Sequence, residues 1–383
     1  MKVCYILPHF YPHVGGGEQA FLDLIEELIK KNIEVRVITS TSGGIKGYKN
    51  YKGIDIYYYD WKMFFGHPIV NKKDIEEHIK WADLVHVGVY SPVRTACKVA
   101  RKEGKPSIVT VHEVLGKRWF WIESNKLKAL AFNLYEKYVV TAKCNYFHTP
   151  SHATETDLKK YNKKAKIRNI YWIVEEEQKK ETVQIDKQKF NNYFNINDND
   201  RIFLNYGRPG KTKGVFIYLN AIEETVKSLS DKELENVKFC FIMAKDPSTE
   251  RAKFVKQVKE RKLEKYVIVK ESVEREDLEN YIMCADYVVV PSITEGFGLT
   301  AIEACSKGKK LIHSSGGSLP EVTFGEVIEF ENKNSKDLSD KLQKIIKNEI
   351  QFNKKERKDF SKETITNEMI SLYNESIKDT EEN

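Results

Sequence analysis

The sequence lacks any pattern that would hold a structural metal. Its six cysteines stand singly, with no Cys-x-x-Cys pair and no histidines at a matching spacing. Isolated cysteines of this kind are typical of reduced core thiols in a cytoplasmic protein. We therefore expect no zinc site and a cytoplasmic location.

Long apolar runs are also missing. No stretch approaches the roughly 18 apolar residues that a membrane-spanning helix needs. The opening stretch, MKVCYILPHFYP, begins apolar but is broken by Pro8 and His9 and carries no small-residue cleavage site. This pattern predicts a first β-strand rather than a signal peptide.

The length and charge of the chain indicate two globular domains with different surfaces. The 383 residues are 41% apolar and 31% charged, which suits two folded cores. The net charge of +7 is uneven, because residues 1–170 hold 28 Lys and Arg against 17 Asp and Glu, whereas the remainder holds 35 against 39. The basic first half predicts an anionic partner, phosphorylated or membrane-bound, although a lysine-rich solvated surface explains the excess equally well. No nucleic-acid-binding module is recognisable, so we expect no nucleic acid partner.

Short strands alternate with helices in the first half. A helix over 18–31 is predicted by one apolar stripe with steps of three and four residues. The stripe consists of Phe21, Leu22, Ile25, Leu28 and Ile29. Runs rich in β-branched and aromatic residues predict strands at 2–8, 34–40, 54–60, 83–89, 106–113 and 145–151. This alternation favours a parallel sheet with right-handed crossovers.

The second half repeats the pattern after a polar, glycine-free linker at 174–200. Its predicted strands are 201–207, 237–244, 266–272, 287–292 and 309–315, and its predicted helices are near 213–228, 248–263, 275–284 and 299–307. We therefore expect an α/β protein with two doubly wound Rossmann-like domains that face each other across a cleft. Ligands of such sheets bind at the carboxyl ends of the strands, which makes the cleft the expected active site.

A glycine-rich loop follows the first strand of each half. Gly15, Gly16 and Gly17 precede the first helix, whose N-terminus would favour an anion, but they do not fit the G-x-G-x-x-G fingerprint, and a plain tight turn explains them as well. In the second half GRPGKTKG, at 207–214, is not a P-loop. Its arginine and its second lysine suit phosphate oxygens, unless they are ordinary surface charges.

A further loop, TEGFGLTAIEA at 294–304, carries two carboxylates eight positions apart. Glu295 precedes a Gly-Phe-Gly turn, and Glu303 lies inside the helix that follows. Backbone amides at the start of a helix favour an anion, and carboxylates are good acceptors for vicinal hydroxyls. A nucleotide-sugar meets these demands, with ribose for one acid, a hexose for the other and the diphosphate between them.

Together these motifs resemble the retaining glycosyltransferases of family 4, which have the GT-B fold. The most specific of them is Glu-x7-Glu within PSITEGFGLTAIEA. The other matching stretches are GRPGKTKG, GGSLPEV at 316–322, the first glycine loop, VTVHE at 109–113 and TPSHATETDLKKY at 149–161. The resemblance spans nearly the whole chain. It departs at RNIYWIVEEE (168–177), which keeps Asn169 but lacks the glycine and aspartate of the family's usual NGVD.

The resemblance implies a role for each matching residue. Arg208 and Lys213 would bind the donor diphosphate, Glu303 the ribose hydroxyls and Glu295 the donor sugar. His112 would lie beside the transferred sugar, although a satisfied core histidine is an open alternative. We take His112, Arg208, Lys213 and Glu295 as the catalytic group. The remaining donor-binding residues are Gly16, Gly17, Gly296, Phe297, Gly298 and Leu299.

The resemblance also implies the domains and the reaction. An acceptor-binding domain would span 1–175 and a donor-binding domain 198–350, and a helical segment at 351–383 would return to the N-terminal domain. The reaction would move a hexose-type sugar, with retention, from a UDP- or GDP-linked donor to a hydroxyl of a glycan or lipid-linked acceptor. Two cations and a helix N-terminus would stabilise the leaving diphosphate, so we expect no metal and no cofactor.

The stretch after VTVHE predicts a surface near which the acceptor binds. Lys117 and Arg118 stand directly before the run WFWI at 119–122. Cations beside aromatic rings suit a membrane interface, which predicts peripheral contact between the N-terminal domain and an anionic membrane at its inner face. A buried aromatic cluster beneath a helix is the competing interpretation.

Other classes of function remain open. A nucleotide-sugar 2-epimerase of the same fold would release an epimerised sugar nucleotide without any acceptor. A non-catalytic nucleotide-sugar-binding subunit would bind the donor without turnover. A dinucleotide oxidoreductase is disfavoured by the missing fingerprint.

Overall fold

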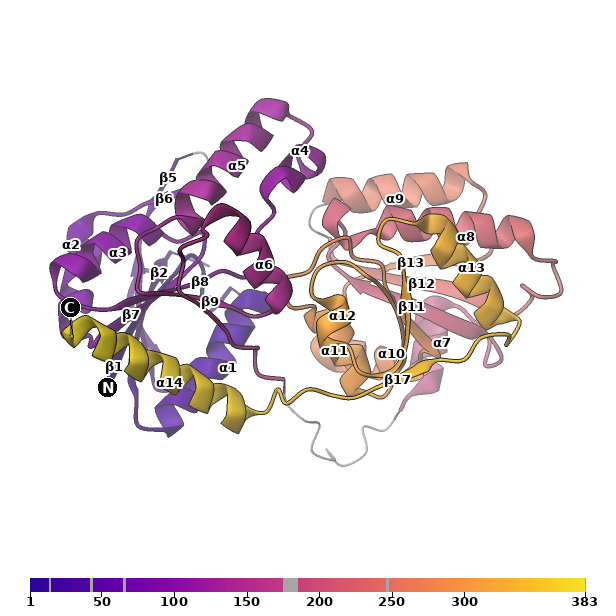
Figure 1. The fold of residues 1–383 in the computed structure, drawn as a ribbon. Helices are drawn as coiled ribbons and strands as arrows, with labels where there is room; N and C mark the ends of the chain where they lie inside the picture. Colours follow the sequence, from indigo (N-terminus) through magenta and orange to yellow (C-terminus); the bar gives the residue numbers. More distant parts are fainter. Residues whose placement is uncertain (14, 42–43, 65–66, 175–184, 246–247, 383) are drawn as a thin grey trace. The chain divides into compact units, whose positions relative to one another are not determined.

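A computed structural model of the chain describes residues 1–13, 15–41, 44–64, 67–174, 185–245 and 248–382. The chain divides into two compact units, Met1–Glu175 with Asp359–Asn383, and Glu176–Lys358. Each unit has a predominantly parallel sheet with helices packed against it (Figure 1). The predicted α/β class with two doubly wound sheets is confirmed. Residues 175–184 of the predicted linker lie outside the described residues, and its later part contains a helix, Lys187–Phe194.

The first unit contains an eight-stranded sheet in the order β10-β9-β8-β7-β1-β2-β4-β3. Its strands are β1 (Lys2–Leu7), β2 (Glu34–Ser40), β3 (Gly47–Tyr51), β4 (Ile54–Tyr59), β7 (Leu84–Gly88), β8 (Ser107–Thr110), β9 (Tyr146–Thr149) and β10 (Ile167–Asn169). Every neighbouring pair is parallel except β3 with β4. β5 (Lys62–Phe64) and β6 (His67–Ile69) form a separate two-stranded sheet.

Helices complete the first unit, and the predicted stripe of α1 faces its core. The helices are α1 (Gly16–Lys30), α2 (Lys72–Trp81), α3 (Val93–Lys102), η1 (Gly116–Arg118), α4 (Trp119–Ile122), α5 (Lys126–Val140), α6 (His152–Tyr161) and α14 (Lys362–Glu381). Phe21, Ile25 and Leu28 of α1 are buried, which explains why this amphipathic segment folds against the sheet. The helix begins at Gly16, so Gly16 and Gly17 form its first turn rather than a loop before it.

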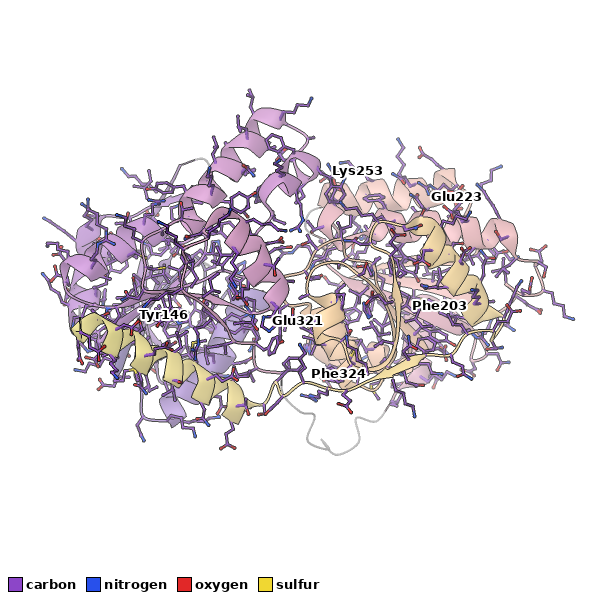
Figure 2. All side chains as sticks on the ribbon, viewed as in Figure 1. Tyr146, Phe203, Glu223, Lys253, Glu321 and Phe324 are labelled. Carbon is purple, nitrogen blue, oxygen red and sulfur yellow. The ribbon has the colours of Figure 1, made fainter. Side chains whose placement is uncertain are left out.

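The C-terminal helix α14 belongs to the first unit and packs against α1 (Figure 1). The Tyr373 hydroxyl lies 2.6 Å from the Tyr5 hydroxyl and 2.7 Å from His86 Nδ1. Further toward the C-terminus of the helix, the Tyr146 hydroxyl, from β9, lies 3.0 Å from Glu375 and 2.9 Å from Asp379 (Figure 2). Side chains of α14 therefore bond to strands from the beginning and the middle of the chain.

The second unit contains a seven-stranded sheet in the order β13-β12-β11-β14-β15-β16-β17. Its strands are β11 (Arg201–Gly207), β12 (Val237–Met243), β13 (Val267–Glu271), β14 (Tyr287–Val290), β15 (Lys310–Ser314), β16 (Gly325–Phe330) and β17 (Asn353–Lys355). Only β17 runs antiparallel to its neighbour in this sheet. Aromatic rings fill much of the core, and Phe203 of β11 stacks on Tyr287 of β14 with ring centres 4.7 Å apart (Figure 2).

The helices of the second unit follow its parallel strands. They are α7 (Lys187–Phe194), η2 (Lys211–Lys213), α8 (Val215–Ser228), α9 (Ser248–Glu260), α10 (Arg275–Cys284), α11 (Leu299–Ser306), α12 (Leu319–Val322) and α13 (Ser335–Ile346). The predicted helices near 213–228, 248–263, 275–284 and 299–307 are thus confirmed as α8 to α11.

Each sheet has one place where consecutive strands diverge to opposite sides. In the first unit this place lies between β1 and β7, and in the second unit it lies between β11 and β14. Loops that leave the carboxyl ends of two such strands run apart and leave a crevice, which is where ligands of doubly wound sheets bind. The loops after β1, β11 and β14 are the ones that carry the motifs singled out in the sequence.

Candidate functional site

Two loops of the second unit pack against each other at the β11–β14 crevice. Gly214 has φ +65°, and a Cβ atom there would lie 1.8 Å from the carbonyl oxygen of Pro291. Only glycine therefore fits where the loop after β11 crosses the loop after β14. The Ile293 amide donates to the Thr212 carbonyl at 2.7 Å, which fixes the two loops together.

A third loop, which carries the GGSLPEV motif, packs against the backbone of the loop after β14. A Cβ on Gly316 would lie 2.6 Å from the carbonyl oxygens of Ser292 and Ile293, and one on Gly317 would lie 2.4 Å from the backbone of Glu295. The Ser318 amide donates to the Glu295 carbonyl at 3.0 Å. The glycine pair thus allows a close backbone approach that fixes the position of Glu295.

The Glu295 carboxylate is held by two side chains. Lys213 Nζ lies 2.6 Å from Glu295 Oε1, and the Ser292 hydroxyl donates to the same oxygen at 2.8 Å. The Glu295 side chain is only 11% exposed, whereas that of Lys213 is 39% exposed. A cation and a carboxylate from different loops therefore meet at the crevice, with the lysine on the wetter side.

Glu303 lies in α11 and is held by residues that the sequence interpretation did not select. The Tyr206 hydroxyl, at the end of β11, lies 2.9 Å from Glu303 Oε2 and 3.0 Å from the Thr300 carbonyl. Arg275, at the start of α10, forms an ion pair with the same carboxylate. Burial and the neighbouring Glu303 carboxylate raise the pKa of Tyr206 well above its usual value, so the phenol stays protonated and can act as a donor.

Three of the predicted donor residues, Arg208, Lys213 and Glu295, border one pocket of the second unit. Its lining comes from the ends of β11 and β14, η2, α8 and α11, and consists of Asn205, Tyr206, Gly207, Arg208, Lys213, Val215, Val290, Ser292, Glu295 and Thr300. Arg208 is exposed, and its guanidinium has no partner among the residues that the structure describes. It is a free cation beside the Lys213–Glu295 pair.

Four further predicted donor residues form the turn into α11, while Glu303 lies within that helix and Gly16 and Gly17 lie in the first unit. Gly296 and Phe297 follow Glu295, and the Phe297 side chain is buried. Gly298 has φ +81°, and a Cβ there would lie 3.0 Å from Leu319 Cδ2, so the turn requires glycine. Leu299 begins α11 and is 37% exposed.

His112 lies in the first unit, directly beyond the carboxyl end of β8. Its ring stacks on Trp172 with centres 5.6 Å apart and meets Phe21 edge-on at 5.5 Å. A Cβ on Gly17 would lie 3.6 Å from His112 Nε2, so the first turn of α1 borders this ring. Burial lowers the pKa of His112 to about 4, which keeps the imidazole neutral at pH 7.

The hydrogen bonding of His112 tests the alternative that it is a core histidine with both ring nitrogens paired. His112 is largely buried, and neither ring nitrogen has a hydrogen-bond partner among the described residues. A core histidine would normally have both polar atoms paired. His112 and Gly17 are thus neighbours in the first unit. Arg208, Lys213 and Glu295 line one pocket of the second unit, and Glu303 bonds to Tyr206 of the same lining.

No metal centre is apparent in the described part of the chain. No group of three or more His, Cys, Asp or Glu side chains there is arranged to hold an ion. No described helix combines the length and apolarity that crossing a membrane would require.

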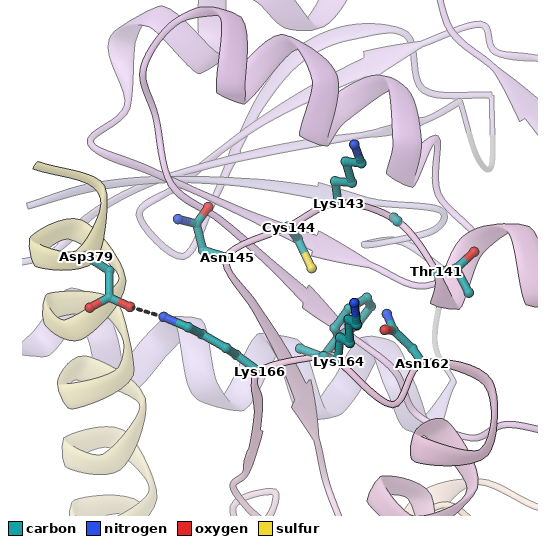
Figure 3. Close-up of a pocket in the computed structure, with 11 residues that line it drawn as sticks. Thr141, Lys143, Cys144, Asn145, Asn162, Lys164, Lys166 and Asp379 are labelled. Carbon is teal, nitrogen blue, oxygen red and sulfur yellow. Dashed lines mark hydrogen bonds and ion pairs between the residues drawn. The ribbon is translucent and has the colours of Figure 1, made fainter. Parts of the chain in front are cut away.

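A second pocket lies in the first unit, away from the predicted site (Figure 3). It has a volume of about 380 Å³ and is bordered by the segments that precede β9 and β10 and by Asp379 of α14. Lys143, Lys164 and Lys166 line it, and Lys166 pairs with Asp379 at 2.7 Å. It therefore lies at the amino ends of the strands, opposite the edge where ligands of this fold bind.

Comparison with known families assigns both halves of the chain to glycosyltransferases. The model described as "Glycosyltransferase Family 4" matches residues 14–178, and the model described as "Glycosyl transferases group 1" matches residues 186–366. The chain belongs to the family 4 glycosyltransferases, as the resemblance of its motifs predicted. It is an enzyme of the glycosyltransferase class.

Individual relatives agree with this assignment. An uncharacterized glycosyltransferase of Methanocaldococcus jannaschii is 23% identical over 349 residues, which cover 85% of this chain and 84% of the relative. A GDP-mannose:cellobiosyl-diphosphopolyprenol alpha-mannosyltransferase of Xanthomonas oryzae is 23% identical over 318 residues, covering 80% and 77%.

Solved structures have the same fold. The HepE protein of Anabaena in complex with UDP-glucose superposes with a TM-score of 0.68 and 14% identity, covering 98% of this chain and 100% of the other. The structural match confirms the predicted GT-B fold.

Proposed function

We propose that this glycosyltransferase moves a hexose-type sugar, with retention of the anomeric configuration, from a nucleoside-diphosphate-sugar to a hydroxyl acceptor, without a metal. The observation that carries the proposal is the crevice between β11 and β14. Arg208, Lys213 and Glu295 line one pocket there, and Tyr206 of the same lining bonds to Glu303 of α11. Two cations and two carboxylates in this arrangement suit a diphosphate between two sugar rings.

The chemistry assigns the cations to the leaving group. The bond between the anomeric carbon and the β-phosphate oxygen breaks, and its electron pair stays on the diphosphate. The acceptor hydroxyl forms its new bond to the same face of the sugar, and its proton passes to the departing phosphate oxygen. Arg208 and Lys213 stabilise the charge that grows on the diphosphate, an effect on the order of 3 kcal/mol for each well-placed donor.

The carboxylates act as acceptors for sugar hydroxyls. Tyr206 and Arg275 orient Glu303, which in the proposed complex accepts the ribose hydroxyls. Ser292 and Lys213 orient Glu295, which accepts from the transferred hexose. His112, neutral at pH 7 and with unpaired ring nitrogens among the described residues, would contribute a hydrogen bond to the reacting sugar from the first unit.

The relatives suggest the substrate class. The Xanthomonas enzyme is named for GDP-mannose and a diphosphopolyprenol-linked acceptor, and the Anabaena structure contains UDP-glucose. We infer a UDP- or GDP-linked hexose donor for this chain, and a glycan or lipid-linked acceptor at the inner face of a membrane.

A panel of UDP-, GDP- and ADP-sugars, each with and without EDTA, tests the donor site by thermal shift. We expect one sugar nucleotide to raise the melting temperature equally with and without the chelator, and Arg208→Ala and Glu303→Gln to abolish the rise. Lys336→Ala, at an exposed position of α13 in the same unit, is the matched control and should behave like the parent. If both donor-site variants keep the full shift, the assignment is wrong.

Product analysis then separates the possible reactions. Mass spectrometry should find a nucleoside diphosphate together with a glycosylated acceptor, and NMR of the product should find the anomeric configuration of the donor. An epimerised sugar nucleotide formed without acceptor would instead identify a 2-epimerase. Binding without any turnover, even with candidate acceptors present, would identify a binding subunit.

A further inference from the structure

One face of α5 exposes apolar side chains away from the body of the first unit. The apolar residues on this face, which we call the α5 face, are Leu127, Leu130, Ala131, Leu134 and Tyr138. Leu127 is 79% exposed, Leu134 56% and Tyr138 53%. Exposed leucines scattered singly are ordinary, but a stripe of them on one helix marks an interaction surface.

The spacing shows that this stripe is one continuous surface. Successive residues of an α-helix are about 100° apart, which places Leu127, Leu134 and Tyr138 within about 40° of one another. The opposite side of the helix holds the buried residues Ala129, Glu136, Val139 and Val140. The helix therefore has two apolar sides, of which only one is used by the fold.

A buried carboxylate fixes α5 to the rest of the unit. Glu136, almost fully buried, accepts from the amides of Leu115 at 2.8 Å and Gly116 at 2.5 Å. These amides lie at the start of η1, shortly after His112. Glu136 thus ties α5 to the segment after β8, which also contains His112. The α5 face is therefore exposed while the unit is folded.

Neighbouring aromatic residues extend the face, and the structure divides the WFWI run between the surface and the interior. Phe120 and Trp121 of α4 are exposed, at 47% and 43%. Trp119 is half-buried and its ring packs on Phe132 with centres 5.0 Å apart. Arg118 pairs with Asp157 at 2.8 Å. The run is therefore neither wholly a buried aromatic cluster nor wholly an exposed surface.

The exposed charges on α5 itself are all positive. Lys126 and Lys137 flank the leucine stripe on one side and Lys128 on the other, and all three are exposed. Of the two acidic residues nearby, Glu136 is buried, and Glu123 lies before the helix, where it accepts from the Asn125 amide. Lysine is depleted in protein interfaces, and two copies of this face would bring lysines against lysines, whereas an anionic lipid surface attracts them.

We propose that the α5 face, with Phe120 and Trp121, docks on an anionic membrane, with the leucines in the acyl boundary and the lysines at the phosphates. This is the pattern of an amphipathic helix that lies in the membrane interface. It would bring the strand end that carries His112 to the lipid surface. The proposal stands on the surface alone and does not depend on the reaction.

Flotation of the full chain with vesicles tests it. Vesicles of phosphatidylcholine with phosphatidylglycerol should carry the parent protein upward, and vesicles of phosphatidylcholine alone should carry much less. The double variant Leu127→Gln/Leu134→Gln should lose at least tenfold in apparent affinity for the anionic vesicles. Ile69→Gln, which changes an equally exposed apolar residue on β6, should bind like the parent.

A lysine series separates charge from apolar contact. Changing Lys126, Lys128 and Lys137 together to Gln should reduce binding to anionic vesicles and weaken its salt dependence. The same change at Lys31, Lys72 and Lys73, exposed elsewhere in the first unit, should have a much smaller effect. Unchanged melting temperatures and an unchanged donor thermal shift would show that each variant is folded.

Two outcomes would overturn the proposal. One is a folded leucine variant that floats as well as the parent, or a parent that does not float at all. The other is sedimentation showing that the leucine variant converts a dimer into a monomer, since the face would then be covered by a second copy of the chain.

Discussion

Lys213 and Glu295 are paired in the crevice of the second unit, 2.6 Å apart. In the proposed complex the diphosphate and the Glu295 carboxylate would both contact the Lys213 ammonium. The lysine would then lie where negative charge grows on the leaving group. We predict that Lys213→Ala lowers kcat/KM for glycosyl transfer by about 10²–10³-fold, the range for removal of one preorganised donor. The comparison is Lys211→Ala in the same turn, which should lose far less. A Lys213→Ala enzyme with unchanged kcat/KM would contradict the assignment.

Tyr206 orients Glu303 without being a charged group itself. Tyr206→Phe removes the hydroxyl 2.9 Å from the Glu303 carboxylate and leaves the ring in place. Because the ribose does not change during the reaction, the loss should appear in binding, with KM for the donor raised about tenfold and kcat little changed. Tyr218→Phe is the control, since that buried hydroxyl has no hydrogen-bond partner among the described residues. A fall in kcat at constant KM would place Tyr206 in the chemical step instead.

Sequence patterns predicted the charged residues of the site but not the residues that hold them. Arg208, Lys213 and Glu295 stand in recognisable loops, and the structure brings them to one pocket. Arg275 is far from Glu303 in sequence, and no local pattern indicates the ion pair that the two side chains form. Tyr206 could have been found, since it precedes the glycine loop at the carboxyl end of a strand.

At the scale of elements, α14 is tied to the sheet by a chain of buried hydrogen bonds. Tyr5 lies 2.6 Å from Tyr373, Tyr373 lies 2.7 Å from His86, and His86 lies 2.6 Å from Thr110. Thr110 in turn lies 2.8 Å from His148, whose Nε2 is 2.8 Å from the Ile170 carbonyl. If each group donates to the next, starting at the Tyr5 hydroxyl and ending at the Ile170 carbonyl, every bond in the chain is made while both histidines are neutral.

Removing one link should therefore loosen α14. Tyr373→Phe deprives the Tyr5 hydroxyl of its acceptor and His86 of its donor, both in the buried core. We expect a loss of about 1–3 kcal/mol in unfolding free energy from each buried group left unpaired. Denaturant unfolding measures it, with Tyr48→Phe, an exposed hydroxyl, as a control that should change stability by less than about 0.5 kcal/mol. Equal stability of the two variants would mean that the chain of bonds contributes little.

The strongly apolar strands were predictable, and the two antiparallel edge strands were not. β1, β7 and β12 are buried on both faces and read as continuous apolar runs, as parallel strands do. The antiparallel strands β3 (GYKNY) and β17 (NKK) have no such pattern, since their shape is imposed by pairing with β4 and β16. Edge strands of this kind are set by tertiary contacts rather than by their own sequence.

For the molecule as a whole, buried neutral histidines set the response to acid. Burial lowers the pKa of His148 and His313 from an ordinary 6.5 to about 4, and it also lowers the pKa of His86 well below 6.5. Because the folded pKa lies below the unfolded one, the unfolded chain binds more protons between pH 6.5 and 4. Stability is therefore complete above pH 6.5 and falls as the pH drops toward 4.

We predict a loss of about 2 kcal/mol at pH 5 for a fully buried histidine of this kind. Thermal unfolding at pH 7 and pH 5 measures it. His148→Gln, which keeps a donor and an acceptor but cannot be protonated, should lower stability at pH 7 and reduce the difference between the two pH values. A variant with the parent's full pH dependence would show that His148 does not titrate on unfolding.

The central claim is that the diphosphate of an activated sugar binds at the carboxyl ends of β11 and β14. A crystal structure of the protein with a sugar nucleotide that stabilises it, grown in EDTA, tests this most directly. We predict the diphosphate within hydrogen-bond distance of Arg208 and Lys213, with the ribose hydroxyls on Glu303 and no metal between them. A diphosphate bound elsewhere, or held there only through a metal ion, would contradict the account.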